Sequence, residues 1–179
     1  MTMRVLVAEG SGFIGRRAVF RLIHDGWGAH VVAQNNPSIE GANFYHVDIS
    51  AQVGVQGVIQ RAEATYLRHF AWDTTPSKYW NSATNLDWVA GSLHLVRLFA
   101  EYGGERAVLA GTCAEYSWRY HTMKERVSLI EPATPHGQAK ASLFELLDRF
   151  TPQMNLPFAW GRIFFPVGLG EKRGRMLPK

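Results

Sequence analysis

The sequence predicts an α/β fold with a parallel sheet covered by helices on both faces. Six apolar segments of strand length recur along the chain, and the segments between them mostly have helical spacing. The strand segments are apolar nearly throughout, which is typical of strands buried on both faces of a sheet. The expected strands are residues 3–8, 29–34, 43–47, 66–71, 106–111 and 157–164.

The first expected helix joins the first two strands. Its apolar positions, from Ile14 to Ile23, share one helical face, and Asp25-Gly26 is a helix-stop signal. Residues 50–63 have the weakest helical pattern, because Gly54 and Gly57 each disfavour a helix by about 1 kcal/mol relative to alanine.

Two longer helices are expected in the second half of the chain. Residues 85–102 carry apolar side chains at helical spacing and few charges, which predicts a long, largely buried helix. Residues 136–150 show the same spacing, and Thr151-Pro152 ends that helix.

Length and composition fit one compact domain. The chain has 179 residues, of which 46% are hydrophobic and 19% charged, and domains average about 150 residues. No run approaches the roughly 18 apolar residues of a membrane span, and the N-terminus enters a strand without a cleavable apolar segment. We therefore expect a cytoplasmic protein without a membrane partner.

Charge and metal-ligand patterns exclude further classes. The net charge is +4, but the basic residues are spread along the chain except in 172–175, so we expect no nucleic-acid partner. The single cysteine, Cys113, excludes an internal disulfide and a cysteine-based zinc site, and we expect it to be a small buried residue. The seven histidines lack ligand spacing, so no metal is expected.

A glycine loop, Gly10-Ser11-Gly12-Phe13-Ile14-Gly15, follows the first strand and opens the first helix. Glycines allow the backbone to turn tightly and to approach a pyrophosphate, which the free N–H groups of the helix N-terminus stabilise. In this context the loop predicts a dinucleotide-binding site.

The loop and five later segments resemble the extended short-chain dehydrogenases, the NAD-dependent epimerase/dehydratase family. Residues 8–15 are similar to the family's Thr-Gly-Gly-x-Gly-Phe-Ile-Gly motif. The later segments, in the family's order, are Val47-Asp48-Ile49, His69-Phe70-Ala71-Trp72, Asn85-Leu86, Ala110-Gly111-Thr112-Cys113-Ala114-Glu115-Tyr116 and Gly161-Arg162-Ile163-Phe164-Phe165. The resemblance implies a Rossmann-type doubly wound sheet and an oxidoreductase or epimerase acting on a nucleotide-activated sugar or related carbonyl.

The resemblance also implies the site residues. Asp48 would contact the adenine, Thr112 falls on the catalytic Ser/Thr, and Lys140 would hold the nicotinamide ribose. The expected cofactor-binding residues are Gly10, Ser11, Gly12, Phe13, Ile14, Gly15, Asp48, Ile49, Ala71 and Lys140. The cofactor is NAD or NADP, because residues 34–36 supply neither the acid typical of NAD sites nor an arginine. Arg16 and Arg17, which follow the loop, slightly favour NADP over NAD.

Two residues depart from the family pattern. Glu9 replaces the first loop glycine, and a carboxylate within 4 to 6 Å of a pyrophosphate would cost a few kcal/mol unless it points away to solvent. His136 replaces the tyrosine of the family's Tyr-x-x-x-Lys pair, which exchanges a proton with substrate. Beside Lys140 it should stay mostly neutral at pH 7, as a possible base and a poor acid. The expected catalytic set is thus Thr112, His136 and Lys140, an altered triad or the remnant of one.

Aromatic residues gather after the fourth strand. Four aromatic residues either line a pocket there or belong to the core or an interface: Trp72, Tyr79, Trp80 and Trp88. Tyr116 is a second candidate for the missing phenol.

Domain organisation and partners follow from the resemblance. Residues 1–165 are expected to form the dinucleotide-binding domain and 166–179 the start of a substrate-binding region that is largely absent. A homodimer is expected through the helices 85–102 and 136–150, because both carry more apolar surface than one sheet face covers. A catalytically impaired dinucleotide-binding or regulatory module, or an interaction subunit without cofactor, remains an alternative.

Overall fold

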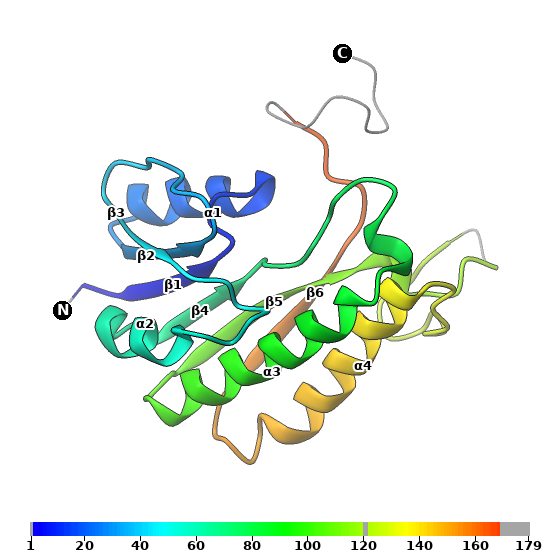
Figure 1. Ribbon diagram of the computed structural model, residues 1–179. Coiled ribbons are helices and arrows are strands. Elements are labelled where there is room, and N and C mark those ends of the chain that lie inside the picture. The colour runs from blue at the N-terminus through cyan, green and yellow to red at the C-terminus, as the bar shows by residue number, and fades with distance from the viewer. Residues whose placement is uncertain (1, 120–121, 169–179) are drawn as a thin grey trace.

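A computed structural model describes residues 2–119 and 122–168, which form a six-stranded sheet flanked by helices (Figure 1). All five strand pairings are parallel, and the strand order is β3-β2-β1-β4-β5-β6. The strands are β1 Arg4–Ala8, β2 Gly28–Ala33, β3 Ala42–His46, β4 Tyr66–His69, β5 Arg106–Thr112 and β6 Phe158–Ile163. This order reverses direction between β1 and β4, as in the predicted Rossmann-type doubly wound sheet.

Helices cover both faces of the sheet unequally. On one face lies α1, Phe13–His24, whose Val19 and Leu22 pack with β1 and β2. The opposite face carries α2, α3 and α4, with bounds Val55–Ala62, Thr84–Glu101 and Pro135–Phe150. Below the sheet in Figure 1, α3 and α4 lie side by side in direct contact. The larger hydrophobic core lies between these helices and the sheet.

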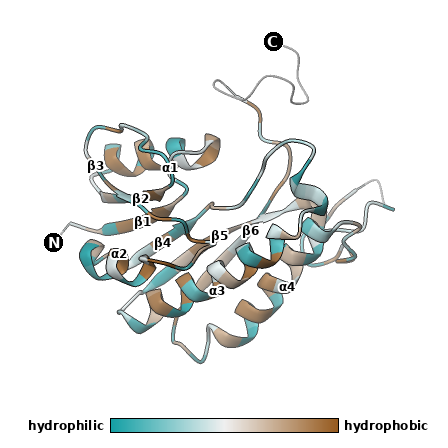
Figure 2. Cartoon of the chain, viewed as in Figure 1, coloured by the Kyte–Doolittle hydropathy of each residue, from teal (hydrophilic) through white to brown (hydrophobic). Residues whose placement is uncertain are grey.

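Apolar periodicity accounts for most of the elements. Figure 2 shows hydrophobic residues on β1 and β2 and, alternating with hydrophilic ones, on α3 and α4. At the start of α4, the hydroxyl of Thr134 accepts the Gly137 N–H at 3.1 Å and Pro135 occupies the first turn, both signals of a helix N-terminus. Helix α1 ends at the predicted Asp25-Gly26 stop, where Gly26 has φ +82°.

The elements differ from the predicted segments mainly at their ends. Strand β4 stops at His69, two residues early, and β6 is one residue shorter at each end. Helix α2 forms within the weakly helical segment, because Gly54 takes the left-handed N-cap position and leaves only Gly57 inside the helix. Two short 3-10 turns belong to no predicted element: Tyr79–Asn81 follows the loop after β4, and Cys113–Glu115 follows β5 directly.

One close helix-to-loop contact positions the loop after β3. A Cβ atom at Gly91 of α3 would lie 2.3 Å from the carbonyl oxygen of Ile49, so only glycine allows this approach. The contact places Asp48 and Ile49 at the carboxyl edge of the sheet. Within the described ranges, no helix is both long and apolar enough to cross a membrane.

Candidate functional site

A cleft of about 770 Å³ opens at the carboxyl ends of the strands, where the strand order reverses between β1 and β4. Ligands of open α/β sheets bind at such a switch point. Most of the predicted site residues line this one cleft: Gly12, Phe13, Ile14, Gly15, Asp48, Ile49, Ala71, Thr112, His136 and Lys140. Residues that are up to 128 positions apart in sequence therefore line the same cleft.

Gly10 and Ser11 of the predicted loop do not line the cleft. Gly10 lies beneath it, where an added Cβ would fall 2.7 Å from a methyl group of Val31. The hydroxyl of Ser11 instead donates a hydrogen bond to Glu9 Oε1 at 2.6 Å. These two residues therefore belong to the loop but not to the wall of the cleft.

Glu9 lines the cleft. The sequence left open whether its side chain lies at the loop or points away to solvent. Its side chain lies against Gly12, since an added Cβ there would be 3.2 Å from Glu9 Cγ. Its φ is 62°, a left-handed conformation that costs a non-glycine residue about 1 to 3 kcal/mol. The glutamate thus takes a backbone conformation that favours glycine and adds a carboxylate beside Gly12.

The N-terminus of α1 faces this loop without a side-chain cap. Gly12 is the N-cap, no side chain of the described residues accepts from the first-turn amides, and the first turn holds no acidic residue. A 12-residue helix with free N–H groups carries a partial positive charge there that suits a phosphate. A dinucleotide pyrophosphate fits this end of the cleft, and the Glu9 carboxylate competes with it.

Asp48 is fixed at the other side of the loop. The hydroxyl of Ser50 donates to Asp48 Oδ1 at 2.6 Å, and Gln34 Nε2 donates to Oδ2 at 2.8 Å. The Ser50 hydrogen bond, assisted by backbone amides and Gln34, lowers the pKa of Asp48. Asp48 is therefore an ionised hydrogen-bond acceptor in the wall of the cleft.

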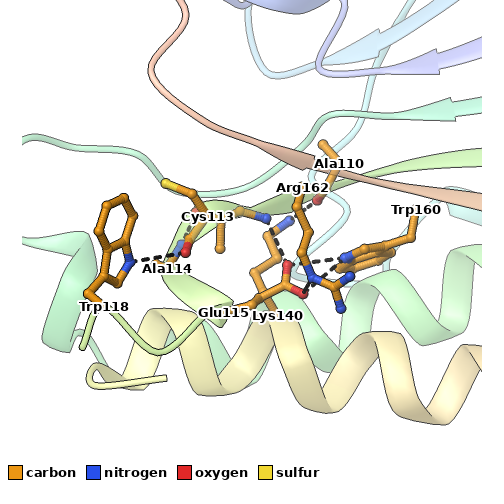
Figure 3. Close-up of polar contacts among 9 residues, drawn as sticks. Ala110, Cys113, Ala114, Glu115, Trp118, Lys140, Trp160 and Arg162 are labelled. Atoms are coloured by element: carbon orange, nitrogen blue, oxygen red, sulfur yellow. Dashed lines mark hydrogen bonds and ion pairs between the residues drawn. The ribbon is translucent and has the colours of Figure 1, made fainter. Parts of the chain in front are cut away.

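A buried carboxylate holds Thr112, and nothing in the sequence predicted its role. Glu115, fully buried, accepts the Thr112 N–H at 2.7 Å and the Trp160 indole N–H at 3.1 Å (Figure 3). Arg162 Nε donates to the other carboxylate oxygen at 2.6 Å. Glu115 thereby joins the ends of β5 and β6.

Lys140 reaches the end of β5 from α4 (Figure 3). Its Nζ donates to the carbonyl of Ala110 at 2.7 Å and lies 3.8 Å from the ring centroid of Trp72, within cation–π range. Burial lowers the pKa of Lys140 to about 7, against the opposing effect of the Glu115 carboxylate. Lys140 therefore titrates near neutral pH.

His136 sits on the same helix, one turn before Lys140, inside an aromatic cage. The rings of Trp72, Tyr79 and Trp80 meet the imidazole edge to face, with centroids 5.9, 4.9 and 5.6 Å away. Burial and the nearby Lys140 ammonium lower the pKa of His136 to about 4, against the opposing effect of Asp73. The ring is neutral at pH 7, as expected from the sequence, and it is also a weaker base than an ordinary histidine.

The aromatic residues divide into two groups. Trp72, Tyr79 and Trp88 line the cleft, whereas Trp80 touches His136 without lining it. Tyr116 is buried under the Arg162 guanidinium, 5.2 Å from its ring centroid, and does not line this cleft. Tyr116 is therefore poorly placed to replace the missing phenol.

Cys113 is buried, and burial raises the pKa of its thiol, as befits a small core residue. Across the described part of the chain, no group of three or more His, Cys, Asp or Glu side chains could hold a metal ion.

The fold and the cleft agree with what the sequence matches. Residues 5–179 match the NAD-dependent epimerase/dehydratase family, and the chain belongs to that family. UDP-glucose 4-epimerase 2 of Arabidopsis thaliana is 24% identical over 191 residues, which cover 94% of this chain and 53% of that protein. UDP-glucose 4-epimerase of Dictyostelium discoideum is also 24% identical, over 92% of this chain and 52% of its own length. The chain spans about half the length of the curated relatives it matches.

Solved structures show the same fold. A UDP-glucose 4-epimerase of Thermotoga maritima, solved with UDP-glucose, superposes with a TM-score of 0.79 at 24% identity, over 89% of this chain and 55% of that one. A UDP-glucose 4-epimerase of Thermus thermophilus in complex with NAD gives 0.76 at 25% identity, over 89% and 54%. A putative epimerase of Burkholderia cenocepacia gives 0.80 at 18% identity, over 95% and 56%.

Proposed function

We propose that this chain binds a nicotinamide dinucleotide in the cleft and carries out oxidoreduction on a nucleotide-activated sugar or related carbonyl. A single observation supports it most. One cleft is lined by residues 12–15 of the glycine loop, by the fixed carboxylate of Asp48, and by the trio of Thr112, His136 and Lys140. Relatives named as UDP-glucose 4-epimerases, one of them solved with NAD, support the same class of cofactor and substrate.

Each end of the cleft has a role in this proposal. The free amides at the N-terminus of α1 hold the pyrophosphate, and Asp48 accepts hydrogen bonds from the adenosine half. The nicotinamide, when bound, supplies hydride exchange with the substrate carbon. Thr112 and Lys140 at the end of β5 orient the nicotinamide half and the reacting oxygen, and His136 lies beside that oxygen as a hydrogen-bonding group.

NADP is the preferred form in this proposal. Gln34 and Asn35 line the cleft after β2 without the carboxylate that would bind a ribose 2′-hydroxyl. Arg16 reaches the same loop, where its Nη1 donates to the carbonyl of Pro37 at 2.8 Å. We expect Arg16→Ala to weaken NADPH binding more than NADH binding.

The direct test is a calorimetric titration of the chain with NADPH and NADH, using three variants. Glu9→Gln removes the charge at the loop, and Glu9→Gly also removes the left-handed strain. Both should raise affinity about tenfold or more, because a carboxylate about 5 Å from a pyrophosphate costs more than the ~1.4 kcal/mol that tenfold requires. Glu40→Gln, an exposed carboxylate outside the cleft, is the control and should change nothing.

Two outcomes would contradict parts of this function. Unchanged or lower affinity in both Glu9 variants would mean that the carboxylate does not oppose the pyrophosphate. If neither dinucleotide binds the parent or the variants, the chain is an interaction subunit instead.

A binding module without catalysis is the second candidate, and His136 is the observation that favours it. Its pKa of about 4 leaves it a poor acid and a weak base at pH 7. Cofactor binding without turnover of UDP-glucose or of a generic carbonyl substrate would favour this candidate.

A further inference from the structure

The side-chain amide of Asn85, at the start of α3, has only one chemically consistent orientation. Its Nδ2 donates to the backbone carbonyls of Tyr79 and Ser82 at 2.7 and 2.8 Å. Its Oδ1 accepts the indole N–H of Trp72 at 2.8 Å. The reversed amide would set an oxygen against two carbonyl oxygens and an NH₂ group against an N–H donor. Asn85 is buried, so water does not rescue the reversed state.

That orientation determines where His136 carries its proton. His136 Nδ1 lies 3.3 Å from Asn85 Oδ1, and an amide oxygen only accepts hydrogen bonds. Nδ1 must therefore carry the hydrogen. A neutral imidazole has a single N–H, so Nε2 keeps its lone pair.

The neutral state and the position of the ring are both enforced by neighbours. Burial and, after it, the neighbouring Lys140 lower the pKa of His136, against the opposing effect of Asp73. The three cage rings of Trp72, Tyr79 and Trp80 hold the imidazole edge to face. His136 lines the cleft, and its Nε2 has no hydrogen-bond partner among the described residues.

We propose that Asn85 is a positioning residue that fixes His136 as its Nδ1–H tautomer, so that Nε2 faces the cleft as an acceptor and selects a ligand hydroxyl over a carbonyl. A hydroxyl donates to this lone pair, whereas a carbonyl oxygen meets it with another lone pair. A phenol, which both donates and accepts, would make no such distinction. The hydroxyl selectivity rests on the proposed function, because it takes this cleft as the substrate site, whereas the tautomer does not.

The tautomer is measured directly by long-range ¹H–¹⁵N NMR on histidine-labelled protein without any ligand. The His136 resonances are assigned by their loss in His136→Phe. We expect Nε2 in the unprotonated range and Nδ1 in the protonated range, unchanged from pH 5.5 to 8. Asn85→Ala should raise the fraction of Nε2–H tautomer. An Nε2–H tautomer in the parent, or titration of the ring near pH 6.5, overturns the inference.

Selectivity is measured with cyclohexanol and cyclohexanone, two probes matched in ring size that differ in the donor. We expect cyclohexanol to bind about fivefold more tightly, the equivalent of ~1 kcal/mol for one hydrogen bond, and to shift the Nε2 resonance. The preference should disappear in His136→Phe. Equal binding of the two probes in the parent overturns the selectivity.

The outcomes separate this inference from the proposed function. An Nδ1–H tautomer and hydroxyl preference in a chain that binds neither NADH nor NADPH would uphold the inference and reject the cofactor. Dinucleotide binding with an Nε2–H tautomer would do the reverse.

Discussion

Two buried polar residues, Glu115 and Asn85, organise the end of the cleft that is lined by Thr112, His136 and Lys140. Each accepts hydrogen bonds from elements that are distant in sequence: Glu115 from β6, and Asn85 from Trp72 and His136. The glycine loop, Asp48, Thr112 and Lys140 could be located from the sequence because each stands in a recognisable local motif. Glu115 and Asn85 also lie in segments that resemble the family's, but nothing in the sequence predicted a role for their side chains, since their partners meet them only after folding.

At the residue scale we predict that His136→Tyr raises any carbonyl-reductase or epimerase activity by about 10² to 10⁴, the contribution of a general acid or base. A phenol beside Lys140 restores a group that donates a proton and reaches farther into the cleft than the imidazole. Activity is assayed by cofactor absorbance with a generic carbonyl and with UDP-glucose.

The control is His136→Phe, because phenylalanine has nearly the volume of tyrosine but no hydroxyl. This variant should gain no activity. Brisk turnover by the parent that is lost in the tyrosine variant would mean that His136 is itself the evolved catalytic group.

At the element scale, one glycine in α3 holds a helix against the loop that carries Asp48. We predict that Gly91→Ala lowers the free energy of unfolding by about 1 to 3 kcal/mol, because its Cβ would lie 2.3 Å from the Ile49 carbonyl and force the loop away. Gly57→Ala is the matched change in α2, where no atom lies within 4 Å. It should raise the free energy of unfolding by about 0.5 to 1 kcal/mol.

Urea denaturation measures both variants. Similar effects of the two substitutions would show that the close approach of α3 to the loop does not govern stability. Dinucleotide affinity should fall with Gly91→Ala and stay unchanged with Gly57→Ala, because only the first displaces Asp48.

A second prediction at this scale concerns the outer surfaces of α3 and α4, which we propose as a homodimer interface. Leu86 on α3 and Leu146 and Phe150 on α4 are 73%, 39% and 53% exposed, although the two helices pack together. Leu146→Glu should convert a dimer into a monomer in sedimentation at micromolar concentration. Val53→Glu, at a 77% exposed apolar position before α2, should leave the dimer intact. A monomeric parent would refute the interface.

At the scale of the whole molecule, the six strands could be predicted because their segments are mostly apolar and turn signals bound them. The strand ends could not, since β4 stops pairing at His69 while the apolar run continues through Phe70 and Ala71 into the cleft wall. Periodicity also gave no reason to expect that histidines and a lysine would be buried together. His69 lies in the core with Nε2 at 2.7 Å from the Ser92 hydroxyl, and its Nδ1 has no partner in the described chain.

This buried basic cluster predicts how the stability of the fold depends on pH. Burial, with the charge of Lys140 adding to it, lowers the pKa of His69 to about 3 and that of His136 to about 4. The unfolded chain therefore binds more protons than the folded chain between these values and the ordinary histidine value near 6.5, so stability falls as the pH falls through that window. Each ring contributes about 1.4 kcal/mol per pH unit, and the two together remove roughly 5 kcal/mol between pH 6.5 and 4.5.

Urea denaturation at half-unit pH steps measures this loss, and two glutamine variants assign it. His69→Gln keeps a polar group near Ser92 but cannot take up a proton, so it should remove about half of the slope below pH 6.5 even if its stability at pH 7 is lower. His24→Gln changes an exposed histidine at the end of α1 and should leave the slope as it is in the parent. If the parent kept the same unfolding free energy from pH 6.5 to 4.5, the two rings would have to be protonated or accessible to water in the folded state, contrary to their burial. Lys140 does not cause the loss below pH 6.5, because its lowered pKa, about 7, makes its own contribution to stability rise only above that value.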